Sequence, residues 1–224
     1  MSKGKYLSDL YKNIDNKLFN VDEAIKFIVD KKREKFDETI EISMNLGIDP
    51  RHADQMVRGI VSLPNGNGKV MKIAVFAKDN KAEEAKQAGA DVVGTDDLAE
   101  DMQKGNLNYD RVIATPDLMG VVGRIGKILG PKGLMPNPKL GTVTTDVKSA
   151  VEAAKSGQVQ YRAEKTGIVQ AGIGKASFGT DKLIENVNSF IEAIQKSRPS
   201  GAKGTFIKKI SISSTMGVGI NVNI

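Results

Sequence analysis

Between residues 69 and 155, short apolar runs alternate with segments rich in helix formers, and this alternation restricts the fold more than any other pattern. Three apolar runs are typical of strands: residues 69–77, 91–94 and 111–114. Four other segments are typical of helices: residues 80–88, 95–105, 116–127 and 145–155. Strands that alternate with helices across short connections predict a small, mostly parallel sheet with helices on its faces. We therefore expect a Rossmann-like three-layer α/β domain over residues 67–159.

The regions before and after this block have a different pattern. Residues 5–32 are expected to form two helices, and residues 181–196 form an amphipathic helix in this prediction. Residues 36–46 alternate between apolar and polar side chains, which predicts a half-buried strand. Three more strands are expected later in the chain, at residues 166–174, 204–214 and 218–224.

Neither flank offers enough strands to build a core alone, so we expect the two flanks to combine. The prediction is a discontinuous α+β domain with an antiparallel sheet, formed by residues 1–66 and 160–224, into which residues 67–159 are inserted. The two crossings, near Pro64–Gly68 and Gly157–Tyr161, would then form a double-stranded hinge with flexible glycine-containing backbone. The alternative is two sequential domains preceded by an irregular helical region.

The composition is compatible with a nucleic-acid partner inside the cell. The net charge is +6, and residues 160–224 hold 9 Lys/Arg against 4 Asp/Glu, a net of +5. The absence of cysteine excludes disulfides and thiolate metal sites, which suits a reducing cytoplasm. No apolar run reaches the ~18 residues that span a bilayer, and the first residues lack the apolar stretch of a signal peptide. We expect a soluble cytoplasmic protein without a membrane partner.

Signals of catalysis are weak. His52 is the one histidine, and a lone histidine without an obvious partner is more often structural than a general base. The sequence lacks a Gly-x-Ser-x-Gly nucleophile elbow, a Walker motif and a dinucleotide-binding fingerprint. Acidic pairs such as Asp96–Asp97 suit the starts of helices. We therefore expect no enzyme activity, no cofactor and no metal site.

Three segments of the split domain are candidates for contact with RNA. In the first, over residues 31–39, the lysines and Arg33 can neutralise phosphates and Phe36 can pack on a sugar or base; the alternative is a solvated helix end with Phe36 in the core. The second is Lys165-Thr166-Gly167, whose alternative is a plain tight turn. The third is the small-residue segment 213–219, whose alternative is an ordinary hairpin turn with Met216 in the core.

A run rich in glycine, proline and lysine over residues 122–142 interrupts the α/β block. Because glycine frees the backbone and proline removes a donor, this run cannot be a long regular helix or strand. It predicts a short helix that opens into an ordered basic loop, with Lys127, Lys132 and Lys139 available to a partner. Within it, Gly130–Gly133 can be interpreted instead as an anion-binding nest of an α/β enzyme or binding module for a phosphorylated ligand.

Several motifs in order along the chain resemble the L-one family of large-subunit ribosomal proteins, in a bacterial type. The motifs that carry the resemblance are Lys35-Phe-Asp-Glu-Thr39, Gly47-Ile-Asp-Pro-Arg51, Val57-Arg-Gly59, Ala114-Thr-Pro-Asp117, Gly130-Pro-Lys-Gly-Leu-Met-Pro-Asn-Pro138, Gly174-Lys-Ala-Ser-Phe178 and Ser214-Thr-Met-Gly217. Such a series covers nearly the whole chain and is far more specific than any single pattern.

The resemblance implies a two-domain structural protein of the mobile ribosomal stalk. It implies binding to large-subunit rRNA, an influence on the release of exit-site tRNA, and repression of its own operon through the mRNA leader. It places RNA contacts at Lys35, Phe36, Thr39, Thr215, Met216 and Gly217, with Lys165, Thr166 and Gly167 as weaker additions. The basic loop with Lys127, Lys132 and Lys139 is a possible second contact with RNA or tRNA. We expect a monomer when the protein is free. A third class, a general nucleic-acid chaperone, remains an alternative.

Overall fold

The structure, a computed structural model, describes residues 5–14, 17–32 and 35–223. Arg33, one of the predicted phosphate contacts, and Ile224, the predicted end of the last strand, lie outside this part of the chain. The chain divides into two compact units: the first comprises Met1–Gly68 and Val159–Ile224, and the second comprises Lys69–Gln158.

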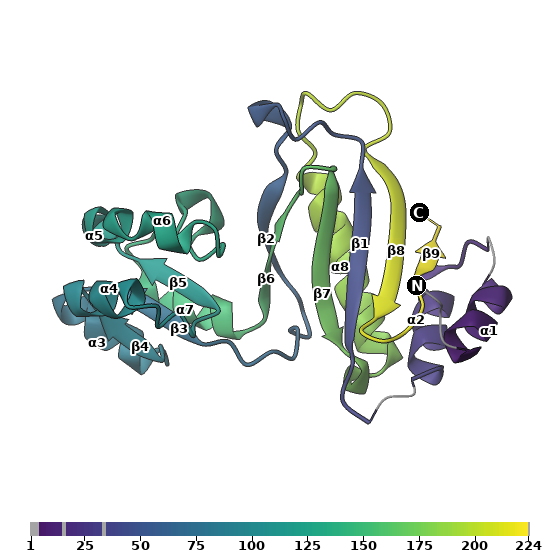
Figure 1. Ribbon diagram of the computed structural model, residues 1–224, viewed down its shortest axis with the longest axis horizontal. Coiled ribbons are helices and arrows are strands. Elements are labelled where there is room, and N and C mark those ends of the chain that lie inside the picture. Colours follow the sequence, from purple (N-terminus) through teal and green to yellow (C-terminus); the bar gives the residue numbers. More distant parts are fainter. Residues whose placement is uncertain (1–4, 15–16, 33–34, 224) are drawn as a thin grey trace. The chain divides into compact units, whose positions relative to one another are not determined.

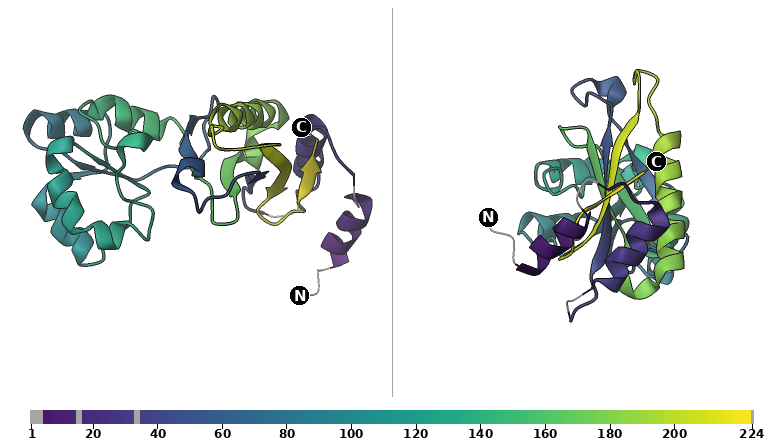
Figure 2. Two further views of the ribbon diagram at one scale, coloured as in Figure 1. Left: turned by 90° about the horizontal axis from the view of Figure 1, so that it is seen from above. Right: turned by 90° about the vertical axis from the view of Figure 1, so that its right-hand side faces the viewer.

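A four-stranded antiparallel sheet forms the centre of the first unit (Figure 1). Its order is β7 (Ile168–Lys175), β1 (Thr39–Leu46), β8 (Ile207–Ser214) and β9 (Ile220–Val222). Every second residue of β1, from Ile40 to Leu46, is buried, so the predicted period of two is confirmed. These side chains face two helices, α2 (Val21–Asp30) and the long α8 (Thr180–Lys196), whose apolar stripes close the core. The right-hand view of Figure 2 shows α8 along one face of the sheet.

The opposite face of this sheet carries small and polar side chains. Residues paired across antiparallel strands share a face, and the pairs here include Glu41 with Ser213 and Ser43 with Ser211. Ser211 donates a hydrogen bond to Asn221 on β9 (3.0 Å). At the β9 edge of the sheet, Phe19 forms a parallel bridge with Val222 of β9. Helix α1 (Lys5–Ile14) comes before Phe19 in the chain. This face is therefore rich in hydroxyl groups and partly exposed.

A second, two-stranded sheet of the first unit was missed by the sequence analysis. It pairs β2 (Arg58–Ser62), which follows the 3-10 helix η1 (Ala53–Gln55), with β6 (Gln158–Arg162). The predicted hinge segment Gly157–Tyr161 is therefore mostly strand. Tyr161 is buried and packs edge-on against Phe190 of α8, with ring centroids 5.9 Å apart. β6 has only five residues, of which two are buried, so the alternation of side chains along it is too short to predict a strand. The packing of Tyr161 stabilises this strand in the structure.

The second unit contains a three-stranded parallel sheet with helices on both faces. Its order is β4 (Val92–Gly94), β3 (Ile73–Phe76) and β5 (Arg111–Ala114). Helices α3 (Asp79–Gln87) and α7 (Val147–Lys155) pack on one face, around Val75 and Val151. Helix α4 (Asp96–Gln103) and the segments that follow β5 pack on the other face, around Phe76. The mixed α/β character expected from the sequence is thus observed.

The predicted helix over residues 116–127 is wrong as a single element. The structure has a 3-10 helix η2 (Pro116–Leu118), then α5 (Met119–Arg124) and α6 (Gly126–Leu129). The break lies at Ile125, whose φ of −98° and ψ of 5° leave the helical region while its side chain stays buried. Gly123 and Gly126 flank it, and glycine weakens a helix interior. A further 3-10 helix, η3 (Pro138–Leu140), lies in the loop that follows, and η4 (Ala176–Phe178) follows β7.

Two polar anchors fix the start of β5 in the second unit. Asp110 accepts hydrogen bonds from Lys69 and from the amide of Lys72, and these bonds lower the pKa of its carboxyl group. Arg111 is buried and donates to the side-chain oxygen (2.7 Å) and the carbonyl oxygen (2.9 Å) of Gln158. Burial lowers the pKa of the Arg111 guanidinium. Lys69 and Gln158, the first and last residues of the second unit, are therefore both bonded to residues at the start of β5.

Candidate RNA interface

Three segments that are distant in sequence meet at one end of the four-stranded sheet. Because β1 runs antiparallel to both neighbours, its first residue, Thr39, lies beside Lys175 at the end of β7 and beside the turn after β8. We call this region, formed by residues 35–39, 175–177 and 214–217, the Thr39 end. It brings together the two predicted RNA-binding groups at Lys35–Thr39 and Thr215–Gly217.

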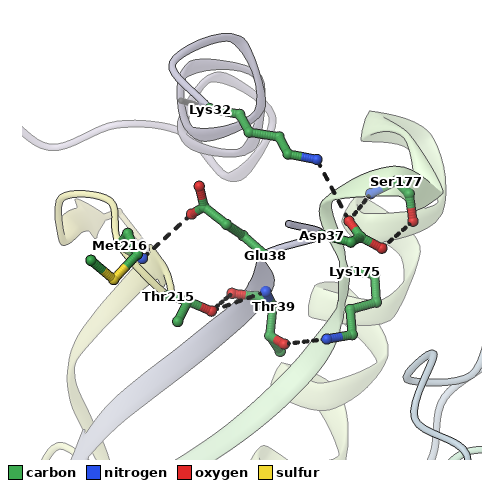
Figure 3. Close-up of polar contacts among 8 residues, drawn as sticks. All are labelled: Lys32, Asp37, Glu38, Thr39, Lys175, Ser177, Thr215 and Met216. Atoms are coloured by element: carbon green, nitrogen blue, oxygen red, sulfur yellow. Dashed lines mark hydrogen bonds and ion pairs between the residues drawn. The ribbon is translucent and has the colours of Figure 1, made fainter. Parts of the chain in front are cut away.

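Thr215 is bound tightly to Thr39 at the Thr39 end (Figure 3). Its hydroxyl oxygen accepts from the amide of Thr39 (3.0 Å) and its hydroxyl hydrogen is donated to the Thr39 carbonyl (3.3 Å). The amide of Thr215 donates to the same carbonyl (3.1 Å). The Thr215 side chain therefore serves first to hold the start of β1 against the turn after β8.

Thr39 and Asp37 are held from the β7 side. The ammonium of Lys175 donates to the Thr39 hydroxyl oxygen (2.8 Å). Asp37 accepts from the amide (3.0 Å) and the hydroxyl (2.7 Å) of Ser177, and its carboxylate lies 3.7 Å from the ammonium of Lys32. The Ser177 hydroxyl, with smaller contributions from the Ser177 amide and from Lys32 and Lys175, lowers the pKa of Asp37. Asp37 is thus an ionised anchor for η4 rather than a free surface acid (Figure 3).

Glu38 and Gly217 fix the turn after β8. Glu38 is buried, its carbonyl accepts from the amide of Ala176 (2.8 Å), and its carboxylate accepts from the amide of Met216 (3.4 Å). A Cβ atom on Gly217 would lie 2.3 Å from the hydroxyl oxygen of Ser214, so residue 217 has no room for a side chain. The conformation of the Thr39 end is therefore fixed by contacts within the chain itself.

Two large apolar side chains are exposed at the Thr39 end. Phe36 is 49% exposed and Met216 is 56% exposed, which rejects the alternatives that place either side chain in the core. Lys35 is also exposed. An aromatic ring, a thioether and a cation beside a compact array of hydroxyl groups form a surface suited to a sugar, a base face and a phosphate.

The third predicted group lies at the opposite end of the sheet. The amide of Leu46, at the end of β1, donates to the carbonyl of Gly167 (2.9 Å). The length of β1 puts this turn roughly 25 Å from Thr39. Gly167 has φ +77°, and a Cβ atom there would lie 3.2 Å from the carbonyl oxygen of Ile48, so the turn requires glycine. Lys165 and Thr166 are exposed but belong to a separate surface from Thr39 and Thr215.

That turn borders an open groove of about 980 Å³, which we call the Arg162 groove. It is lined by Pro50, Arg51, Met56, Arg162, Ala163, Glu164, Lys165 and Thr166. The sequence analysis assigned no role to Arg51 or Arg162. The two arginines lie more than 100 residues apart in the sequence, and the pairing of β2 with β6 brings their segments together. Neither segment alone therefore indicates a basic groove.

The basic loop of the second unit is ordered by its own hydrogen bonds. The hydroxyl of Thr142 accepts from the amide of Asn137 (2.7 Å), and the Asn137 side chain accepts from the amide of Lys139 (2.9 Å). Lys127, Lys132 and Lys139 are all exposed. The amides of Gly133 and Leu134 donate to main-chain carbonyls of this loop and of α6. Those two amides are therefore not available to an anion, which weakens the interpretation of Gly130–Gly133 as a nest.

Within the described ranges, no three His, Cys, Asp or Glu side chains gather in a way that could hold a metal ion. The same part of the chain contains no helix long and apolar enough to cross a membrane.

The sequence also matches a known family over most of its length. The model of the ribosomal protein L1p/L10e family matches residues 21–218, a range that includes the Thr39 end, the Arg162 groove and the whole second unit. The chain belongs to the ribosomal protein L1p/L10e family, which consists of structural ribosomal proteins that bind rRNA.

Proposed function

We propose that this protein binds large-subunit rRNA chiefly through the Thr39 end of its first unit. The observation that carries the proposal is the preformed arrangement at that end: hydroxyl groups of two threonines, a turn closed by Gly217 against Ser214, and exposed Phe36 and Met216. Short donors and acceptors at close range suit 2′-hydroxyl groups and phosphates, and an exposed aromatic ring suits a sugar or base. We assign RNA contacts to Lys35, Phe36, Thr39, Met216 and Gly217, and to the exposed Thr215, whose hydroxyl also holds Thr39 in place.

A second contact through the Arg162 groove is supported by its charge and position. Arg51, Arg162 and Lys165 outnumber the one acid of the lining, Glu164. The polar face of the sheet, with Ser43 and Ser211, lies between the two ends of the strands. A folded RNA that lies along this face would meet hydroxyl groups at one end and cations, which neutralise phosphates, at the other.

The finer roles are proposals supported by family membership. We propose that the protein sits in the mobile stalk of the large subunit in the cytoplasm, assists the release of exit-site tRNA, and represses translation of its own operon. One RNA site on the first unit would serve both rRNA and the mRNA leader, which would compete for it. The second unit would be an independently folding Rossmann-like domain, with Lys127, Lys132 and Lys139 as a contact for tRNA or a second RNA helix. The free protein would be a monomer without enzymatic activity.

The test is a binding titration of the full chain with large-subunit rRNA fragments, followed by footprinting. We expect one fragment to be bound in the presence of excess unrelated RNA at physiological salt, with a footprint confined to a folded region. If the excess unrelated RNA displaced the rRNA fragment from the protein, the protein would be a general nucleic-acid chaperone instead.

The Arg162 groove gives a separate prediction about the salt dependence of binding. The double variant Arg162→Gln, Lys165→Gln is expected to lower the slope of log affinity against log salt by roughly 1 to 2, because each lost phosphate contact removes about 0.7 to 0.9. The matched control is Lys182→Gln, an exposed lysine on α8, which should leave the slope unchanged. A slope equal to that of the wild type would remove the groove from the RNA interface.

A further inference from the structure

The bond from Lys175 restricts the rotation of the Thr39 hydroxyl hydrogen. Lys175 donates to the Thr39 hydroxyl oxygen (2.8 Å), and an ammonium group has donors only. This bond uses a lone pair of the Thr39 oxygen, so the hydroxyl hydrogen is directed to another acceptor. The neighbouring Thr215 differs, because its own hydroxyl hydrogen is already given to the Thr39 carbonyl. Thr39 is therefore the threonine of the pair whose hydrogen is free for a partner.

We propose that Lys175 is a positioning residue that sets the Thr39 hydroxyl as a hydrogen-bond donor to an acceptor oxygen of the bound RNA. The inference rests on the proposed function and assigns a role to a residue that carries none there. The acceptor is an oxygen of a phosphate, a ribose or a base carbonyl.

An irregularity of the sheet places Lys175 for this role. The register of β1 with β7 pairs Glu41 with Gly172 but Ile40 with Gly174, so Ile173 is an extra residue in β7. A regular ladder continued from Glu41 and Gly172 would place Gly174 opposite Thr39. The bulge shifts the pairing by one residue and places Lys175 there instead.

The surroundings of Lys175 favour a positioning role over a direct phosphate contact. Its stem is packed, since a Cβ atom on Gly68 would lie 2.7 Å from the Cγ of Lys175. Its charge also interacts with the ionised Asp37, which Ser177 holds in place. An ammonium that is bound to Thr39 and partly balanced by a carboxylate is less available to neutralise an RNA phosphate, so it should release few counterions from the RNA.

A double-mutant cycle in the full chain tests this role with the bound rRNA fragment as the probe. Thr39→Val and Lys175→Met are each expected to weaken binding on the order of tenfold, and the double variant no more than the worse single one, because both remove the same contact. Lys175→Arg, which keeps a charge and donors, should bind better than Lys175→Met. The slope of log affinity against log salt should stay at the wild-type value in every variant.

Additive losses in the double variant, on the order of 100-fold, would overturn the inference. So would a slope that falls by about 0.7 to 0.9 in Lys175→Met, because it would show a direct phosphate contact. Lys182→Met controls for the loss of a charge, and thermal melting confirms that each variant is folded; Lys175→Gln replaces Lys175→Met in the cycle if the latter does not fold. A wild-type chain that ignores the fragment would refute the proposed function itself, which is a different result from additivity.

Discussion

Replacing Thr215 with valine is expected to weaken binding of the rRNA fragment by about 1–3 kcal/mol, or roughly 5- to 150-fold. Valine has nearly the shape of threonine but cannot accept from the amide of Thr39 or donate to its carbonyl. In the free protein this region is exposed, so water can satisfy both groups. Under a bound RNA the Thr39 amide would be buried without this partner, whereas the Thr39 carbonyl keeps its bond from the amide of residue 215. That cost appears only in the complex.

The expected signature is therefore a large loss of affinity with a small change in melting temperature. A filter-binding titration and a thermal melt on the same preparation measure the two quantities. The control is Thr205→Val, the same chemical change at an exposed threonine near the other end of β8. Wild-type affinity in a folded Thr215→Val variant would remove this turn from the RNA site.

Replacing Asn186 with leucine is expected to lower the free energy of unfolding by about 2–4 kcal/mol. Asn186 is fully buried on α8. Its side-chain oxygen accepts from the amide of Asn65 (3.1 Å), and its side-chain nitrogen donates to the carbonyls of Gly66 and Ile173 (both 2.9 Å). Leucine fills a similar volume but leaves three main-chain groups without this partner, in a place that the side chain shields from water.

The same change should loosen residues 65–66, because Asn186 ties this segment to β7. Urea denaturation measures the loss of stability, and hydrogen exchange at Asn65 reports the local effect. Asn188→Leu on the exposed side of the same helix is the matched control and should change stability by less than about 0.5 kcal/mol. If Asn186→Leu also lowered the free energy of unfolding by less than about 0.5 kcal/mol, the three hydrogen bonds of Asn186 would not be important for stability.

Strong local patterns in the sequence predicted most of the strands and helices. Residues 111–114 form β5 as predicted, because four buried residues in a row suit a strand with both faces covered by helices. The alternation in residues 36–46 predicted β1 and its buried face. β2 and β6 were missed because each is short and half-buried, and their order depends on packing against α8.

The candidate site was predictable only in part. Thr39, Thr215 and Gly217 were identified from motifs, and the structure brings them together. The link from Lys175 to Thr39 spans 136 residues and depends on a bulge, which leaves no local signal in the sequence. The distance between Thr39 and Lys165 was equally hidden, because it follows from the antiparallel register of β1 and β7 rather than from either motif.

The central claim is that the two ends of the chain together make the RNA-binding surface. Its most direct test is a chain in which residues 1–68 are joined to residues 159–224 by a short glycine-serine linker and the second unit is omitted. We expect this chain to fold cooperatively and to bind the rRNA fragment with an affinity within about tenfold of the full protein, since the proposed contacts of the first unit are retained. A chain that folds but does not bind the fragment would contradict the account.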